Sequence, residues 1–260
     1  MNENLLVHSL EFPSLKDMFG INDEICIIAG PCSIENIEQL ELIATTLKQN
    51  KVRFMRGGAF KPRTSPYEFQ GLGIDGLKLL KQVCDKYSLL SVSEILDPRD
   101  IENALEFIDV IQIGSRSMQN TALLKEVGKT NHPVLLKRGM MSSLREFLLA
   151  AEYIVSEGNN TIILCERGIR TFENSTRNTL DISSIAIIRN ETSLPVIVDL
   201  SHSLGRKDIL LPVAKAVIAL GVNGIMLELH NDPANALSDA KQQLSIQEFK
   251  DFYEKVKLSQ

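Results

Sequence analysis

Two patterns of hydrophobic residues alternate along the chain. Short continuous runs rich in Val, Ile and Leu are separated by longer segments in which apolar residues recur every three or four positions. The first pattern is typical of a parallel strand buried on both faces, and the second of an amphipathic helix. Eight such runs predict eight strands, at residues 25–29, 52–55, 89–92, 110–113, 134–136, 161–164, 196–200 and 224–229.

The helices between these strands have recognisable ends. Ser143 and Glu146 form a capping-box pattern at the start of one helix. Asp97, which is followed by a proline, is typical of the N-cap of another. Asp208 is expected to begin a helix that ends near Gly221. Strands and helices therefore alternate, which indicates a parallel sheet covered by crossover helices.

Eight strand–helix units in 260 residues, without a linker or repeat, predict a single (β/α)8 TIM barrel. A doubly wound open sheet is the alternative, but it usually carries a GxGxxG fingerprint after its first strand, where this chain has GPCSIEN at residues 30–36. Residues 25–260 are therefore expected to form the catalytic barrel. Residues 1–24 are expected to be a short N-terminal extension, such as a strand or hairpin that closes the barrel floor.

Composition restricts the class of protein. The chain is 44% hydrophobic and 23% charged, with 28 Lys and Arg against 33 Asp and Glu, a net charge of −5. This balance is typical of a soluble globular protein and argues against a nucleic-acid-binding surface. Four cysteines without a CxxC pair indicate free thiols in a reducing compartment, and neither a signal peptide nor a membrane span is evident. We therefore expect a cytoplasmic protein.

Polar residues follow the predicted strands. The carboxyl ends of the strands in a TIM barrel converge on the active site, so these residues are expected to lie together. Their many cations predict an anionic substrate, because Arg and Lys are the usual partners of phosphate and carboxylate. The polar residues are Cys32, Glu35, Arg56, Lys61, Arg63, Glu94, Ser115, Arg116, Lys137, Arg138, Glu166, Arg167, Arg170, Asp199, His202, Glu228 and His230.

Some of these side chains are also metal ligands. Cys32, His202 and Glu228 follow strands one, seven and eight, which are neighbours in a closed barrel, and Asp239 follows in the next segment. A thiolate, an imidazole and carboxylates suit Mn, Fe, Co or Zn better than Mg or Ca. From the residues alone, other roles stay open: Cys32 as a buried hydrophobe, Cys32 as a nucleophile with His202 as its base, and His230 as a competing ligand.

Motifs spread over nearly the whole chain resemble one enzyme family. They are GPCSIEN, RGGAFKPRTSPYEFQGLG, QIGSRSMQN, LLKRGM, CERGIRTFE, DLSHS and LELHNDPANALSD. The chain resembles the 3-deoxy-D-arabino-heptulosonate 7-phosphate (DAHP) synthases, and within them the small branch that also contains the 3-deoxy-D-manno-octulosonate 8-phosphate (KDO8P) synthases. The resemblance implies a metal-dependent condensation of phosphoenolpyruvate with erythrose 4-phosphate, the first step of the shikimate pathway.

The resemblance also implies roles for individual residues. One divalent metal ion would be bound by Cys32, His202, Glu228 and Asp239. Phosphoenolpyruvate would be bound by Arg56, Lys61, Ser115, Arg116, Lys137 and Arg167, with its phosphate held chiefly by the last three. The aldose phosphate would be bound by Arg63, Thr64 and Ser65. Lys61 is the candidate for proton transfer, with Glu166 or a metal-bound water as the alternative.

Two competing functions stay open at this point. KDO8P synthases, which use arabinose 5-phosphate, resemble the chain but have two residues between the Lys and the Arg of this motif, whereas only Pro62 intervenes here. A non-catalytic barrel that binds a phosphorylated metabolite is the alternative of another class, and the complete set of ligands and cations argues against it.

The family also suggests expectations about assembly and regulation. Relatives are commonly dimers or tetramers, so a homodimer or homotetramer is expected. Many carry a regulatory domain, for which the short N-terminal extension leaves no room. Little direct feedback inhibition is therefore expected, and regulation through a separate partner protein stays open.

Overall fold

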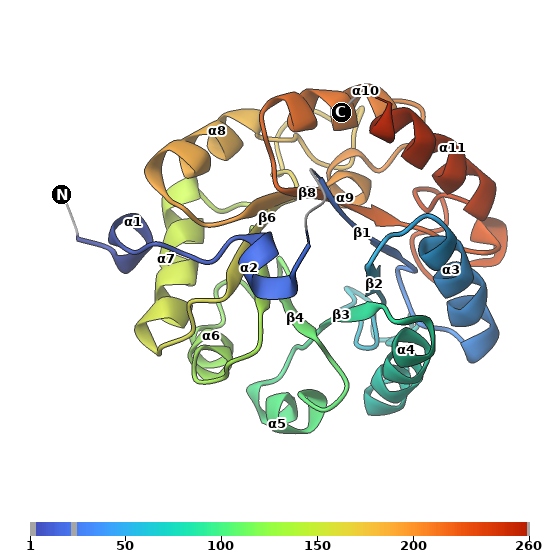
Figure 1. The fold of residues 1–260 in the computed structure, drawn as a ribbon, viewed down its shortest axis with the longest axis horizontal. Coiled ribbons are helices and arrows are strands. Elements are labelled where there is room, and N and C mark those ends of the chain that lie inside the picture. Colours follow the sequence, from blue (N-terminus) through green and yellow to red (C-terminus); the bar gives the residue numbers. More distant parts are fainter. Residues whose placement is uncertain (1–3, 22–24, 259–260) are drawn as a thin grey trace.

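The protein, described here by a computed structural model of residues 4–21 and 25–258, is a closed barrel of eight parallel strands (Figure 1). The strands follow one another around the barrel in chain order, and β8 pairs with β1. The predicted TIM barrel is therefore confirmed, and every predicted strand overlaps an observed one. The strands are β1 (Cys26–Gly30), β2 (Phe54–Arg56), β3 (Leu90–Glu94), β4 (Val110–Ile113), β5 (Val134–Lys137), β6 (Ile162–Glu166), β7 (Val196–Asp199) and β8 (Gly224–Glu228).

Helices surround the barrel and cover the outer face of every part of the sheet (Figure 1). Among the described residues, no helix is both long enough and apolar enough to cross a membrane. The main helices are α3 (Ile37–Gln49), α4 (Ile74–Tyr87), α5 (Ile101–Ala104), α6 (Thr121–Gly128), α7 (Leu144–Ser156), α8 (Ile182–Glu191), α9 (Leu200–Leu204), α10 (Leu210–Ala219) and α11 (Ile246–Lys257).

The predicted helix ends are partly correct. The capping box of Ser143 and Glu146 begins α7, as predicted. Asp97 caps a single 3-10 turn that leads into the short helix α5. The expectation for Asp208 is wrong, because α10 begins at Leu210 and the Asp208 carboxylate instead accepts hydrogen bonds from Arg206. The Asp208 carboxylate thus binds the Arg206 side chain and makes no capping hydrogen bond to α10.

Two separate apolar layers result from the alternation of side chains along each strand. One set of positions, which includes Ile28, Phe54 and Ile163, fills the inside of the barrel. The intervening positions, such as Ala29 and Leu164, pack against the surrounding helices. Because successive side chains in a strand point to opposite faces, the same alternation decides which residues at the strand ends point inward.

The N-terminal segment contains two short helices, α1 (Leu6–Ser9) and α2 (Leu15–Phe19), rather than the expected strand or hairpin. A capping box at Ser14 begins α2, and Gly20 ends it in the left-handed conformation. Leu15 belongs to the apolar cluster inside the barrel, and the Phe19 ring packs edge-to-face on Phe54 with ring centroids 4.9 Å apart. This segment therefore packs against the barrel interior next to the start of β2. Residues 1–3 and 22–24 of the expected extension lie outside the described residues.

Candidate active site

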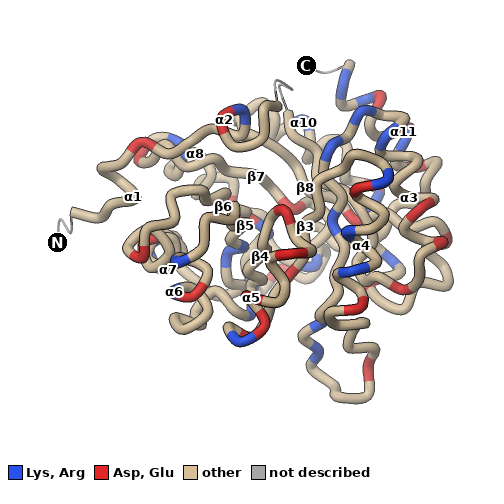
Figure 2. The backbone as a smooth tube through the Cα atoms, turned by 60° about the horizontal axis from the view of Figure 1, so that its bottom comes forward, with Lys and Arg blue, Asp and Glu red and all other residues tan. Residues whose placement is uncertain are grey.

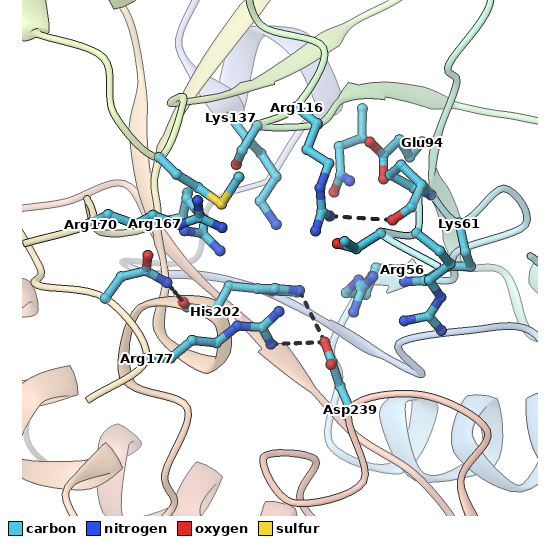
Figure 3. Close-up of a pocket in the computed structure, with 18 of the residues that line it drawn as sticks. Arg56, Lys61, Glu94, Arg116, Lys137, Arg167, Arg170, Arg177, His202 and Asp239 are labelled. Atoms are coloured by element: carbon cyan, nitrogen blue, oxygen red, sulfur yellow. Dashed lines mark hydrogen bonds and ion pairs between the residues drawn. The ribbon is translucent and has the colours of Figure 1, made fainter. Parts of the chain in front are cut away.

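The carboxyl ends of the strands open into a pocket of about 200 Å³ (Figure 3). Elsewhere, acidic and basic residues are interspersed along outer helices such as α3, α4 and α11 (Figure 2). In the pocket lining, basic residues outnumber the three acids, Glu68, Glu94 and Asp239. A protein of net negative charge thus has a cationic site at one end of its barrel. The basic lining residues are Arg56, Lys61, Arg63, Arg116, Lys137, Arg167, Arg170 and Arg177.

Strand alternation places the deepest of these cations. Cys165 lies inside the barrel, so Arg167, two residues further on, points the same way and lines the pocket. Lys137 is likewise two residues beyond the inward-facing Leu135, and Arg56 is two residues beyond Phe54. The backbone hydrogen bonds of the sheet therefore hold the base of each of these three side chains.

Arg116, Lys137 and Arg167 form one side of the pocket, here called the phosphate side. In Figure 3 their charged ends point into the same space. Lys137 and Arg167 are each only 4% exposed. Lys137 pairs with the buried carboxylate of Asp199, and Arg116 donates a hydrogen bond of 3.3 Å to the carbonyl of Pro62. Three cations at one point suit a dianionic phosphate group.

Two buried donors in the pocket have no acceptor among the described residues. They are the Nε atoms of Arg56 and Arg167. Burial lowers the pKa of Arg167 below its ordinary value, although a guanidinium remains charged at neutral pH. An unpartnered buried donor is costly, so both guanidiniums keep hydrogen-bonding capacity that an anion in the pocket would use.

The opposite side of the pocket, here called the metal side, brings together the predicted ligands: His202 and Asp239 line the pocket, and Cys32 and Glu228 lie buried beside them. Single ligand atoms of Cys32, Glu228 and Asp239 all lie within 4.8 Å of one another. His202 Nε2 lies 3.4 Å from Glu228 Oε1 and 3.7 Å from Asp239 Oδ2. A thiol, an imidazole and two carboxylates at this spacing fit a transition-metal ion such as Mn, Fe, Co or Zn.

Asp199 orients the imidazole of His202. Asp199 caps α9 by accepting the backbone N–H of His202, and its Oδ2 lies 2.8 Å from His202 Nδ1. This contact turns Nε2 toward Glu228 and Asp239. Burial lowers the pKa of His202 below its ordinary value, so the ring is neutral at pH 7, as metal ligation requires.

Each anionic ligand also has a cationic neighbour. Arg56 Nη1 lies 2.7 Å from Glu228 Oε1, and Arg177 Nη1 lies 2.9 Å from Asp239 Oδ2. Burial by itself would raise the pKa of Glu228, but His202 and Arg56 hold it well below its usual range. Burial and Glu228 would likewise raise the pKa of Asp239, yet Arg177 and His202 lower it. Both carboxylates are therefore charged and able to bind a cation.

Cys32 behaves differently. Burial, followed by the charge of Glu228, raises the pKa of its thiol to about 11, even though Lys61 Nζ lies 3.1 Å from Sγ. Such a thiol is protonated at pH 7 and would release its proton when a metal ion binds to the sulfur. The hypothesis that Cys32 is a nucleophile with His202 as its base loses support for two reasons. The pKa of the Cys32 thiol is high, and His202 Nε2 faces the carboxylates of Glu228 and Asp239.

Hydrogen bonds join the two loops that carry Cys32 and Asp239. The Ser33 and Ser238 hydroxyls lie 2.6 Å apart. The amide oxygen of the buried Gln243 accepts the Cys32 N–H at 3.0 Å, and its Nε2 donates to the Ser238 carbonyl at 2.8 Å. We call these contacts the loop network. They fix the two loops relative to each other beside the metal side.

His230 contacts Glu35 and not the ligands of the metal side. Its Nε2 lies 3.3 Å from Glu35 Oε1, and its Nδ1 accepts the backbone N–H of Asp232. Glu35 Oε1 also accepts the N–H of Leu237. The hypothesis that His230 competes as a ligand is therefore not supported by its position.

The residues expected to bind the aldose phosphate lie at the mouth of the pocket. Arg63 and Thr64 line it, and Arg63 Nε donates to the Phe69 carbonyl at 2.9 Å. Ser65 lies next to them but outside the lining, where its hydroxyl accepts the N–H of Tyr67. Ser115 lines the pocket beside the phosphate side.

Glu166 is not in the pocket, contrary to its expected acid–base role. It lies between the inward-facing Cys165 and Arg167, so strand alternation turns it outward, toward the helices. There its carboxylate accepts hydrogen bonds from Arg138 and from the N–H of Gly168. The structure thus places no acid–base group at this position, and Lys61 is the remaining protein candidate.

Several pocket residues had no assigned role from the sequence. Glu94 is a strand-end carboxylate whose pKa is raised by burial although nearby cations lower it. Asp199, which is buried beside the pocket and does not line it, also ends a strand, so its position at a strand end marks it in the same way as Glu94. Arg177 and Asn178 lie far from any strand end, in the long loop between β6 and α8, where no periodic pattern marks them. Only the folded loop brings them into the pocket.

The chain is similar to known proteins over most of its length. Residues 9–260 match the model of the DAHP synthetase I family. A phospho-2-dehydro-3-deoxyheptonate aldolase of Thermotoga maritima is 53% identical over 236 residues, which are 91% of this chain and 70% of that protein. A crystal structure of a T. maritima phospho-2-dehydro-3-deoxyheptonate aldolase (DAHP synthase) matches with a TM-score of 0.91 and 50% identity, covering 95% of this chain and 73% of that one. A 2-dehydro-3-deoxyphosphooctonate aldolase of Syntrophotalea carbinolica is 31% identical over 250 residues, 89% of either chain.

Proposed function

The chain belongs to the DAHP synthetase I family, and we propose that its strand-end pocket condenses phosphoenolpyruvate with erythrose 4-phosphate to give DAHP and inorganic phosphate. The observation that carries this assignment is that the three cations of the phosphate side line one small pocket together with His202 and Asp239, and that Cys32 and Glu228 lie buried beside these two ligands. A phosphorylated enol and an aldehyde held on these two sides would lie next to each other. The reaction therefore needs no further domain to bring its partners together.

Phosphoenolpyruvate would bind on the phosphate side. Arg116, Lys137 and Arg167 would hold its phosphate, and Arg56, Lys61 and Ser115 would hold the rest of the molecule. The unpartnered Nε atoms of Arg56 and Arg167 support this placement, because an anion would supply the acceptors that these buried donors lack.

The donor set of the metal side fits a divalent ion held by Cys32, His202, Glu228 and Asp239. Such an ion supplies Lewis-acid polarisation of the aldehyde group of erythrose 4-phosphate. The neutral His202 and the charged carboxylates are in the protonation states that ligation needs. Arg63 and Thr64 would bind the phosphate of this sugar at the pocket mouth.

The bond changes follow from the two substrates. C3 of the enol attacks the aldehyde carbon to form the new C–C bond, and water adds to C2 as positive charge develops there. The resulting hemiketal phosphate then loses phosphate by cleavage of its C–O bond. Lys61 would give a proton to the former aldehyde oxygen, because it lines the pocket and its Nζ lies 3.1 Å from Cys32 Sγ on the metal side.

The four-carbon sugar is the favoured aldose. The chain is 53% identical to a heptonate aldolase but 31% identical to the octonate aldolase. The single Pro62 between Lys61 and Arg63 supports the same choice. The shorter spacing would change the position of Arg63 relative to the bound sugar phosphate.

An assay of the purified protein with Mn²⁺ and phosphoenolpyruvate tests this proposal. Each aldose phosphate is offered in turn, and loss of the enol absorbance and release of phosphate are followed. We expect consumption with erythrose 4-phosphate, its loss after treatment with a chelator, and its return with added Mn²⁺. Consumption with arabinose 5-phosphate alone would reassign the reaction, and consumption with neither would favour the non-catalytic barrel.

We infer a cytoplasmic homodimer or homotetramer, with a separate partner protein as its regulator. Exposed apolar side chains on the strand-end loops support an assembly, since Tyr67, Met141 and Phe172 are 95%, 81% and 99% exposed. Sedimentation analysis tests this assignment directly, because a monomer at micromolar concentration would contradict it.

A further inference from the structure

A buried ion-pair cluster lies directly behind the phosphate side, between the barrel and the helices. Its centre is Arg138, which is 3% exposed. Arg138 Nη1 lies 2.9 Å from Glu166 Oε2, 2.8 Å from Asp181 Oδ2 and 2.9 Å from the Ser184 hydroxyl. Its Nε and Nη2 both donate to the Ser142 carbonyl, at 3.2 Å and 3.1 Å. One guanidinium therefore joins β5, β6, the turn before α7 and the start of α8.

Each end of the central ion pair is next to a phosphate-side cation. Arg138 follows Lys137, and Glu166 precedes Arg167. Because side chains alternate along a strand, Lys137 and Arg167 point into the pocket while Arg138 and Glu166 point away from it. The outward pair thus joins the two neighbouring strand ends whose inward side chains hold the phosphate.

Other contacts make this junction rigid. The N–H of Arg138 donates to the Cys165 carbonyl at 3.0 Å, which extends the β5–β6 pairing by one residue. Glu166 Oε1 accepts the N–H of Gly168 at 2.7 Å, directly after Arg167. Gly168 has a φ of +81°, and a Cβ there would lie 2.7 Å from the Asn178 Cβ. The backbone on both sides of Arg167 is therefore held by Glu166 and by close packing.

We propose that Arg138 and Glu166 are positioning residues that set the separation and direction of Lys137 and Arg167, and so set the affinity of the pocket for a phosphate group. This inference rests on the proposed function of the phosphate side. Neither side chain is among the residues that line the pocket, so neither would touch the substrate. The ion pair acts through the backbone of two strand ends. Because Arg138 is bonded to Lys137 and Glu166 to Arg167, a backbone shift at either member of the pair also moves the neighbouring cation.

A general structural role predicts a different result from a positioning role. Loss of a buried ion-pair partner lowers stability and would affect every site in the barrel to a similar extent. A positioning role predicts a selective loss of phosphate affinity, because the metal side is built from β1, β7, β8 and their loops. The two roles are therefore distinguished by comparing the binding of phosphate with the binding of metal.

The experiment measures the dissociation constants of inorganic phosphate, phosphoenolpyruvate and Mn²⁺ by calorimetry, together with kcat, KM and the melting temperature. The variants are Glu166→Gln, which keeps the shape but removes the charge, and Arg138→Lys, which cannot reach all its partners at once. Lys81→Met is the matched control, because it breaks an ion pair with Asp109 on the outside of the barrel. A double variant, Arg138→Met with Glu166→Leu, replaces the pair by apolar atoms, so that neither member of the pair is left as an unpaired buried charge.

We expect Glu166→Gln, Arg138→Lys and the double variant to weaken phosphate and phosphoenolpyruvate binding about tenfold, a size typical of an outer-shell contact. Mn²⁺ affinity and kcat at saturating phosphoenolpyruvate should not change, and Lys81→Met should leave all three affinities as in the wild type. Wild-type affinity for phosphate in the double variant would overturn the inference. So would a parallel loss of phosphate and Mn²⁺ binding. Failure of the wild-type protein itself to bind phosphoenolpyruvate would overturn the proposed function and this inference together.

Discussion

The two sides of the pocket are positioned in different ways. On the phosphate side, Lys137 ends β5 and Arg167 follows β6 directly, so the hydrogen bonds of the sheet hold them. On the metal side, Cys32 and Asp239 lie in loops, and His202 lies on the short helix α9. Only Glu228 is a strand residue there. The sheet therefore positions two of the three phosphate-side cations, while Arg116 lies in the turn after β4. Contacts between loops position most of the metal side.

This difference teaches that the two sides are separable. A parallel sheet places inward side chains at fixed intervals, and a barrel closes that pattern with little freedom. A loop has no such repeat, so its ligands depend on side-chain hydrogen bonds such as those of the loop network. Asp199 contacts both Lys137 and His202, so coupling between the two sides is expected through that carboxylate. Changes at other residues of one side should leave binding on the other side nearly intact.

The largest expected effect is on the metal side. In Cys32→Ser, an alcohol replaces the thiol that a transition metal prefers. Metal affinity should fall by more than the roughly 10- to 100-fold that is typical of an outer-shell change. Competition with a chromogenic chelator measures this loss, and phosphoenolpyruvate binding without metal should stay unchanged.

Cys84→Ala is the matched control for that substitution. Cys84 is a fully buried thiol that packs in the layer between the sheet and the helices. Its loss should lower stability without changing the metal content. Full activity of Cys32→Ser with stoichiometric metal would contradict the assignment of Cys32 as a ligand.

The next effect tests the phosphate side. Arg116 is exposed, so Arg116→Gln should fold normally. Loss of a charge-assisted hydrogen bond of about 1.5–3 kcal/mol predicts roughly 10- to 100-fold weaker phosphoenolpyruvate binding. Calorimetry should show an unchanged Mn²⁺ affinity in the same variant. A similar weakening of both ligands would show that the two sides are not independent.

A smaller effect is expected from the loop network. Ser33→Ala removes one hydroxyl of the pair formed with Ser238. Metal affinity should fall by up to about tenfold, since the loops of Cys32 and Asp239 lose one of their contacts. Ser156→Ala, at an exposed hydroxyl on α7, is the control. Unchanged metal affinity in Ser33→Ala would mean that the remaining contacts suffice.

The smallest effect concerns stability near the start of α8. Burial by itself would raise the pKa of Asp181, but hydrogen bonds from Arg138 and from the N–H of Ser184 lower it below its ordinary value. The folded state therefore gains stability above the unfolded pKa of about 3.9 and loses it as the pH falls through the lowered pKa. Urea titrations of Asp181→Asn and the wild type should differ by about 1 kcal/mol at neutral pH and converge in acid. A constant difference at all pH values would contradict this account.

Much of the fold was predictable from local patterns. The eight apolar runs each became a strand, because burial on both faces demands an unbroken apolar sequence. The capping box of α7 formed as predicted, since its contacts are local. Asp208 does not cap α10, because its carboxylate accepts hydrogen bonds from Arg206, two residues before it. Local signals are thus reliable where no neighbouring side chain competes.

The pocket was predictable only in part. The strand-end rule found the cations and the ligand types, but it treated Glu166 and Arg167 as equivalent. They differ because one residue along a strand changes the face on which a side chain lies. Arg177 was missed, since the long loop between β6 and α8 folds back to place it against Asp239.

The sequence by itself determined the barrel, the strand order and the chemical types of the side chains at the strand ends, because apolar periodicity and residue identity are local properties. The tertiary structure alone decided which of those side chains meet. It placed the Arg138–Glu166 ion pair on the side of the strands that faces the helices, and it joined the loops of Cys32 and Asp239 by hydrogen bonds. The physical reason is that facing and contact depend on strand ends and loop paths that are set by packing across the whole barrel.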